Sequence, residues 1–292
     1  MPSYALITAA RDEAAYIPTL LDAVTRQSVL PQHWLIVSDG SIDSTDEIVR
    51  NYRGKFPFIE LSRLESGVKV GFSSKARALN IATHRILSGT CDFIGYLDAD
   101  VSFGPSYLES LLSKFASDPR LGIAGGFIYE EKATVFRPRV TNSERSVGGA
   151  IQMYRRQCLS DVGDFLPLRY GGEDWHAEVR ARMAGWKVVA FPELPVYHHR
   201  PTASSGGLLK GHYRQGLMDY AVGTHPLFEV VKAARRLGCK PLVIGSAVRL
   251  TAFGIAAFRG DPRPVSQACV DFLRTEQTER LRHSLKRFFL TT

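Results

Sequence analysis

The sequence has few cysteines, and none in the patterns that build disulfide frameworks or zinc sites. Its 292 residues contain four, at positions 91, 158, 239 and 269, and no two of them form a CxxC pair. Small disulfide scaffolds and zinc knuckles need clustered or regularly spaced cysteines. Both classes are therefore disfavoured, and we expect a chain that works in a reducing compartment, the cytoplasm.

The sequence also lacks a long apolar run that is free of charge. Charged residues follow soon after the N-terminal MPSYALITAA, so no signal-like segment develops and we expect no secretory signal. Residues 241–258 are almost wholly apolar, but Arg249 lies near their centre. The pieces on either side are shorter than the about 20 residues that a membrane span needs. We therefore expect a buried or interfacial helix here rather than a transmembrane one.

The familiar phosphate-binding loops are missing as well. Neither GxxxxGK[ST] nor GxGxxG occurs in the chain. These glycine-rich loops hold the phosphates in P-loop NTPases and in Rossmann dinucleotide enzymes. Their absence disfavours both classes, and a bound nucleotide diphosphate would need a metal ion in place of such a loop.

Positive charge is concentrated in the last third of the chain. The net charge is +8; residues 200–292 hold 15 lysines and arginines against 6 aspartates and glutamates, whereas residues 1–199 hold 22 against 23. This excess has two interpretations, a solvated basic tail or a surface that faces phosphates or an anionic membrane. We expect no nucleic-acid partner. Peripheral contact with the cytoplasmic face of a membrane stays open.

The first half of the chain alternates strand-like and helix-like segments. Short β-branched and aromatic runs are typical of buried strands, and apolar residues at three- or four-residue spacing indicate helices. Such alternation predicts βαβ units and an α/β fold with a mainly parallel sheet. The expected strands cover residues 4–9, 33–38, 56–62 and 92–97, and the expected helices cover residues 14–26, 44–53, 75–88 and 105–116.

The pattern changes near residue 120. Strand-like segments at 121–130, 148–154 and 187–191 surround one expected helix at 173–184, and the chain is mostly helical from residue 205 onward. We therefore expect one mixed α/β domain followed by a helical, basic C-terminal extension. The boundaries are residues 1–204 for the domain, with a nucleotide-binding half at 1–118 and a second half at 119–204, and residues 205–292 for the extension.

Carboxylates follow the expected strands of the first half. Asp39 comes after the second strand, and Asp98 and Asp100 come after the fourth, in the run YLDADVSF. Ligands bind at the carboxyl ends of parallel strands, although an aspartate there is often only part of a turn. Two aspartates this close repel each other unless a cation lies between them. Mg²⁺ or Mn²⁺ fits such ligands and is commonly shared with substrate phosphates.

Five segments resemble, in order, the motifs of family 2 glycosyltransferases: LITAARDEAAYI, LIVSDGSIDSTDEIV, KARALNIA, YLDADVSFGPSYL and GGEDWHAEVRARMAGWKV. The resemblance covers residues 4–200. It implies the GT-A fold and an inverting enzyme that moves a sugar from a nucleotide-diphosphate sugar, a UDP- or GDP-sugar, to an acceptor hydroxyl. The first motif departs from the commonest form at Thr8, where proline is frequent, and at Arg11, where asparagine is frequent.

The resemblance also implies a donor-binding site. Thr8 and Asp39 would contact the nucleotide base, and Arg11 and Glu13 would border the base and ribose. Lys75 would approach the nucleotide or its phosphates. Lys75 and Glu13 also have a simpler interpretation, as charged residues at the start of helices.

A divalent cation, Mn²⁺ or Mg²⁺, would be bound beside the donor. The resemblance implies that Asp100 binds it directly and that Asp98 binds the ribose or the metal. In some family members a histidine about two dozen residues after the catalytic aspartate completes the metal site, which favours His198 over His199. Arg200 would then meet a phosphate.

The catalytic base comes from the GGEDWH motif. An inverting transfer needs one group that deprotonates the acceptor hydroxyl as it attacks. In the family this group is the aspartate of ED, which assigns Asp174, with Glu173 and Trp175 as acceptor-binding neighbours. The simpler interpretation is that acidic residues at a helix N-terminus only complement the helix dipole.

Two other functions are compatible with parts of the sequence. A nucleotidyltransferase of the same fold also uses aspartates and a cation, but it usually has a glycine- and lysine-rich loop after the first strand, and TAARDEAA has none. A non-catalytic nucleotide-sugar-binding subunit of a membrane assembly would not need the complete set of acidic motifs. We expect a transferase that acts on a glycan or lipid-linked saccharide, for example in envelope or exopolysaccharide assembly.

Overall fold

The computed structural model describes residues 2–64, 72–132, 135–200, 207–237 and 241–290. The chain forms two compact units. The first comprises residues 1–167 and 173–202, and the second comprises residues 168–172 and 203–292. Each is considered by itself below.

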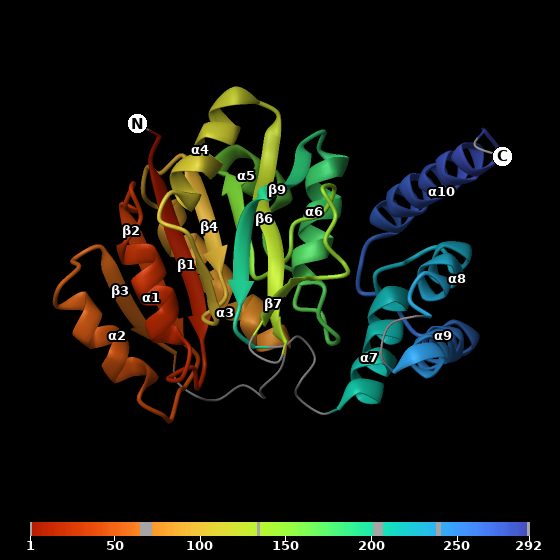
Figure 1. The fold of residues 1–292 in the computed structure, drawn as a ribbon, viewed down its shortest axis with the longest axis horizontal. Helices are drawn as coiled ribbons and strands as arrows, with labels where there is room; N and C mark the ends of the chain where they lie inside the picture. The colour runs from red at the N-terminus through yellow and green to blue at the C-terminus, as the bar shows by residue number, and fades with distance from the viewer. Residues whose placement is uncertain (1, 65–71, 133–134, 201–206, 238–240, 291–292) are drawn as a thin grey trace. The chain divides into compact units, whose positions relative to one another are not determined.

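The first unit is built on one mixed sheet of nine strands, in the order β3-β2-β1-β4-β8-β6-β9-β5, with β7 paired to β6 (Figure 1). Strands β3, β2, β1 and β4 are mutually parallel, and β8 joins β4 in the antiparallel sense. The strands are β1 (Tyr4–Ala10), β2 (His33–Ser38), β3 (Ile59–Arg63), β4 (Phe93–Leu97), β5 (Val101–Phe103), β6 (Leu121–Lys132), β7 (Val135–Pro138), β8 (Ile151–Arg155) and β9 (Lys187–His198).

Helices cover both faces of this sheet because the strands are apolar on both sides. In β1, Leu6 packs into one core and its neighbour Ile7 into the other, as the alternation of strand side chains requires. The first core includes residues of α1 (Ile17–Thr25), α2 (Thr45–Arg53) and α4 (Tyr107–Ser117). The second includes residues of α3 (Phe72–Leu87), α5 (Arg156–Val162) and α6 (Glu173–Met183).

The α/β architecture with a mainly parallel sheet in its first half matches the sequence-based expectation, with differences in the second half. Strand β9 was expected to end at residue 191, before Pro192, but it continues to His198. A register shift against β6 lets it do so, since Phe191 pairs with Gly126 and Pro195 pairs with Phe127. The short strand β5 was not expected. It pairs with the end of β9 and sets Val101 opposite His198.

The second unit is helical, as expected. Helix α7 packs closely against α9, because Gly216 leaves no room for a side chain there. A Cβ at Gly216 would lie 2.2 Å from the carbonyl oxygen of Arg249. The helices of this unit are α7 (Leu208–Ala221), α8 (Pro226–Ala234), α9 (Leu242–Arg259) and α10 (Gln267–Leu290).

A buried network of ion pairs joins three of these helices. Arg249 of α9 is 1% exposed. Its Nε donates to Glu229 of α8 at 2.6 Å, its Nη1 donates to Gln215 of α7 at 2.8 Å, and its Nη2 donates to Asp219 of α7. Lys232 adds a second ion pair to Asp219, at 2.6 Å. Two positive and two negative charges thus balance inside the unit, which repays part of the cost of burying them.

We predict that Arg249→Met destabilises the second unit by about 3–5 kcal/mol, because it leaves buried carboxylates short of a partner. Thermal and urea unfolding followed by circular dichroism measure this change. Arg259→Met, at the exposed end of the same helix, is the matched control and should change the stability little. Equal stability of the two variants would contradict the importance assigned to the network.

Candidate functional site

The candidate site lies where several strands of the first unit end. Strands β1, β2 and β4 are parallel, so the residues after them share one edge of the sheet. Asp39 follows β2, and Asp98 and Asp100 follow β4. Strand β9 brings His198 to the same place, because its last residue pairs with Val101, directly after Asp100.

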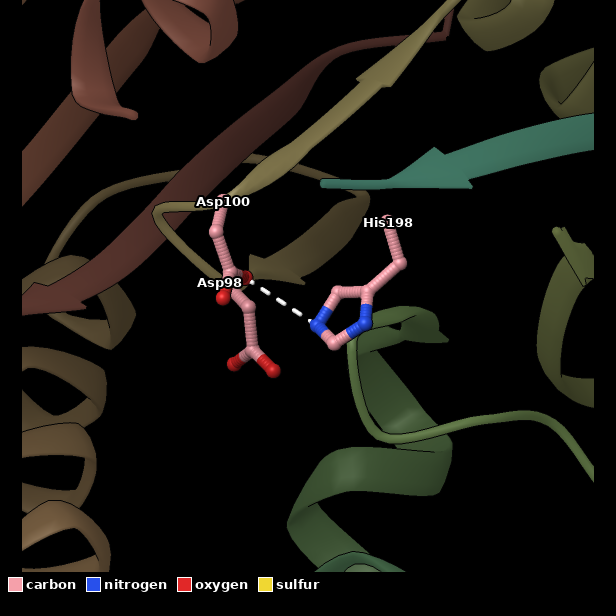
Figure 2. A group of neighbouring side chains, drawn as sticks. All are labelled: Asp98, Asp100 and His198. Carbon is pink, nitrogen blue, oxygen red and sulfur yellow. Dashed lines mark ion pairs between the residues drawn. The ribbon is translucent and has the colours of Figure 1, made fainter. Parts of the chain in front are cut away.

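Asp98, Asp100 and His198 form one cluster (Figure 2). Each offers a ligand atom, and the three atoms lie within 4.8 Å of one another. His198 Nε2 is 3.2 Å from Asp100 Oδ1. The other imidazole nitrogen, Nδ1, is buried and has no hydrogen-bond partner in the described part of the chain. Two carboxylates and an imidazole suit a divalent cation, and the imidazole favours Mn²⁺ over Mg²⁺.

The charges in this cluster reinforce one another. Burial by itself would raise the pKa of Asp100, but the hydrogen bond from His198 and the charges of His198 and Arg200 lower it overall. Burial would lower the pKa of His198, but the two aspartates raise it. The imidazole nitrogen thus stands where a cation would bind, and it would have to be free of its proton to act as a ligand.

Arg200 connects the cluster to the loop after β1. Its Nε is 3.5 Å from Asp100 Oδ2, and its Nη2 pairs with the carboxylate of Glu13. The guanidinium also lies over the ring of Tyr16, 4.8 Å from the ring centroid. Burial raises the pKa of Glu13 to about 7, with Arg200 opposing the rise and the two aspartates of the cluster adding to it. Arg200 is thus held by an acid on each side.

Of the other residues expected to contact the nucleotide, Arg11 and Asp39 lie at the sheet edge, whereas Thr8 lies in the core. Arg11 Nη1 is 3.6 Å from Asp39 Oδ2, and both side chains are partly exposed at the sheet edge. Thr8 is fully buried, and its hydroxyl accepts a hydrogen bond from Trp34 Nε1 at 3.1 Å. The structure thus shows Thr8 packed in the core, and its contact with a base stays a prediction.

Lys75 links the aspartate cluster to the acidic start of α6. Its Nζ is 2.5 Å from Asp98 Oδ1. Burial would lower the pKa of Lys75, but Asp98, Glu173 and Asp174 together raise it. Glu173 itself is buried, and its Oε2 has no hydrogen-bond partner among the described residues. Burial and the neighbouring Asp174 raise the pKa of Glu173 to about 7, although Lys75 opposes the rise.

Asp174 lies against a glycine of the loop before β8. A Cβ at Gly149 would lie 2.0 Å from Asp174 Oδ2 and 2.7 Å from its Cγ, so only glycine lets the carboxylate take this position. Trp175, the next residue, is half-buried. The loop residue Gly149 was not identified from the sequence, since nothing local links it to a helix that begins at Glu173.

The same loop is held by Glu178, a second residue that the sequence analysis missed. Glu178 is fully buried one turn after Asp174. Its Oε1 accepts from the Val147 amide at 2.7 Å and from Gln152 Nε2 at 3.2 Å, and its Oε2 accepts from Ser146 Oγ at 2.9 Å. The sequence did offer one signal: at helical spacing, Glu178 falls on the same side of α6 as Ala177 and Ala181, both of which are buried.

The second of the twin histidines faces away from the cluster. His199 Nε2 is 2.8 Å from Ser102 Oγ, and its ring meets the ring of Phe136 edge to face. Of the two, only His198 belongs to the three-residue group.

The chain matches known glycosyltransferase sequences. A model described as Glycosyl transferase family 2 matches residues 5–171, more than half of the chain. A second, described as Glycosyltransferase like family 2, matches residues 127–217. The chain is 26% identical to the glycosyltransferase AglE of Haloferax volcanii over 231 residues, which are 74% of this chain and 72% of that protein.

Solved structures share the fold. The mannosyltransferase PcManGT from Pyrobaculum calidifontis, in complex with GDP-Man and Mn²⁺, matches 96% of this chain and 81% of its own at a TM-score of 0.59 and 18% identity. TarS from S. aureus, in complex with UDP-GlcNAc, matches 88% of this chain and 73% of its own at a TM-score of 0.56 and 15% identity. The expected GT-A type of fold is confirmed.

We predict that Glu173 makes stability fall as the pH rises. Its pKa is about 7 in the folded chain against an ordinary value of 4.5, so the folded state holds a proton that the unfolded state loses between these pH values. Glu173 should contribute at most about 3 kcal/mol to the fall in stability across this window, and Glu173→Gln should remove that contribution. Urea unfolding at several pH values between about 4.5 and 8 measures it.

The exposed Glu47 of α2 offers a control for the loss of one carboxylate. Glu47→Gln should keep the wild-type dependence on pH. If the curves of wild type and Glu173→Gln run parallel, Glu173 does not bind its proton more tightly on folding.

Proposed function

The chain belongs to glycosyl transferase family 2, and from this premise we propose that it is an inverting, metal-dependent transferase. Its donor would be a nucleotide-diphosphate sugar, a UDP- or GDP-sugar, and its acceptor a hydroxyl group. The observation that carries the proposal is the cluster of Asp98, Asp100 and His198, joined through Lys75 to the acidic pair Glu173 and Asp174.

The residues present fit a cation and a diphosphate. Asp98, Asp100 and His198 would hold Mn²⁺ or Mg²⁺, which when bound would neutralise charge on the departing nucleotide diphosphate. Arg200 would exchange its ion pair with Glu13 for a phosphate oxygen, since both its present partners are acids. Arg11 and Asp39 would border the base, with the Asp39 carboxylate accepting from a base N–H.

Asp174 is proposed as the base that takes the proton of the acceptor hydroxyl. The absence of a side chain at Gly149 leaves room for this carboxylate in its observed position. Glu173 and Trp175 would contact the acceptor. A Glu173 side chain with a pKa of about 7 carries a proton part of the time at neutral pH and can then donate a hydrogen bond to the acceptor, which Asp174 cannot do once it is ionised.

The acceptor is proposed to be a glycan or a lipid-linked saccharide, processed at the cytoplasmic face of a membrane during envelope or exopolysaccharide assembly. The basic second unit supports this, because residues 203–292 hold 14 lysines and arginines against 6 aspartates and glutamates. The other two functions fit less well. A nucleotidyltransferase would need a phosphate loop that this chain lacks. A non-catalytic subunit would not need a glycine at position 149 to make room for the Asp174 carboxylate.

The decisive assay measures nucleotide release from a panel of UDP- and GDP-sugars, with and without Mn²⁺ or Mg²⁺. We predict release that stops in the presence of a chelator. Asp174→Asn should lower the transfer rate by about 10²–10⁴-fold, because the base is lost, while calorimetry still detects donor binding. Full activity of Asp174→Asn would exclude Asp174 as the catalytic base. Nucleotide release that persists without a divalent cation would exclude a metal requirement.

We also predict that Gly149→Ala impairs transfer without unfolding the protein. The added Cβ would displace the Asp174 carboxylate, which is the end of a side chain and moves at little cost in stability. A displacement on the order of 1 Å at a reacting group lowers the rate by up to about 100-fold. Gly104→Ala is the matched control, because a Cβ there meets nothing within 4 Å. Unchanged transfer by Gly149→Ala would show that this contact does not position the base.

A further inference from the structure

Helix α9 of the second unit buries a charge and leaves large apolar residues exposed. The one charge in residues 242–258 is Arg249, and it faces inward, 1% exposed. Apart from Thr251, the exposed side of this stretch carries small or apolar residues and no charge, and Phe258 is 95% exposed. A helix of a water-soluble unit normally buries its apolar side and exposes its charges. The exposed apolar residues of α9 include Leu242, Val243, Ile244 and Phe258.

The helix is long and apolar enough to cross a membrane by length and composition alone. Two observations favour a position along the membrane surface instead. Its 18 residues extend about 27 Å, slightly less than the apolar core of a bilayer, about 30 Å thick. Its inner side is also tied to α7 and α8 through Arg249, Asp219 and Glu229, so crossing would either break these ion pairs or take them into the lipid.

Exposed apolar residues also occur on the helices that pack against α9. On α8 and the residues after it, Leu227, Val230 and Leu237 are exposed at the three- and seven-residue spacing of one helix side. On α7, Leu208, Leu209 and Tyr213 are exposed at its N-terminal end. Large apolar side chains in such number mark a surface that binds a membrane or another protein.

The charges of these three helices identify the partner. Between residues 207 and 259, the two acidic residues are Asp219 and Glu229. Both are buried and paired with Arg249 and Lys232. The exposed charges in the described part of this stretch are therefore basic, and include Lys210, Arg235 and Arg259. An apolar surface with positive charge alone complements an anionic lipid surface, whereas a second copy would carry the same charge and be repelled.

We propose that the exposed side of α8 and α9 is a docking surface for an anionic lipid bilayer. The apolar residues would enter the level of the headgroups and upper acyl chains, and the basic residues would contact the lipid phosphates. Neither contribution alone gives stable anchoring. This inference concerns a surface outside the catalytic unit, and it is independent of which sugar is transferred.

Co-sedimentation with vesicles tests the docking surface in the absence of any donor. Wild type should bind vesicles of equal parts phosphatidylcholine and phosphatidylglycerol, bind pure phosphatidylcholine much more weakly, and dissociate as salt is added. Val243→Glu/Phe258→Glu should bind the anionic vesicles about tenfold more weakly or worse. Ile81→Glu/Val140→Glu is the matched control. It alters two exposed apolar residues of the first unit by the same charge and should bind as wild type does.

Three results would overturn the proposal: wild type that does not bind anionic vesicles, equal loss in the two double variants, or a stable dimer that Val243→Glu/Phe258→Glu dissociates. A second measurement covers the case in which that variant does not fold. A dye that responds to polarity, attached to Phe258→Cys in a Cys239→Ser background, should shift to the blue on anionic vesicles. A dye that stays in water would equally exclude docking.

Discussion

The arrangement of the first unit depends on the repulsion between Asp98 and Asp100. Both follow a fully buried strand, and two ionised carboxylates this close are stable only beside positive charge. The chain supplies that charge from separate places: Lys75 at the start of α3 pairs with Asp98, and His198 and Arg200 at the end of β9 pair with Asp100. The three-residue strand β5 makes this possible, because it fixes the end of β9 directly beside Asp100.

Much of the fold was predictable from local sequence patterns. Short apolar runs indicate strands that are buried on both faces, and apolar residues at three- or four-residue spacing indicate helices. These patterns predict the parallel half of the sheet with its helices, and also the helical second unit. The end of β9 was not predictable. Pro192 normally ends a strand, yet the chain passes through a bulge and resumes pairing at Pro195. The partner strand permits this at Gly126, where a Cβ would lie 1.8 Å from the carbonyl oxygen of Leu194. A contact between residues so far apart in the chain leaves no local pattern.

The candidate site, too, was predictable only in part from the sequence. Motifs identify which carboxylates gather at the sheet edge, but they do not show what holds each one. Glu178 is the clearest example. It is a buried acid that accepts hydrogen bonds from Ser146 and Val147 of the loop before β8 and from Gln152 of β8 itself. The same loop carries the glycine beside Asp174. Burial raises the pKa of Glu178 to about 8. Burying an acid costs free energy, and here the hydrogen bonds from two loop residues and one strand residue offset part of that cost. We infer that fixing the position of this loop matters more than the stability that an apolar residue would add.

Helices α7 to α9 of the second unit bury charges and leave large apolar residues exposed. Around Arg249, the buried charges of Asp219 and Glu229 are neutralised by Arg249 and the partly buried Lys232, so the interior carries no net charge. The exposed surface of α7 to α9 is then left with apolar and basic residues. In a unit that met only water, stability and solubility would both be higher with the charged residues outside and the apolar residues inside. The arrangement is favourable where the outer side meets lipid, because burying the carboxylates removes the groups that an anionic bilayer would repel.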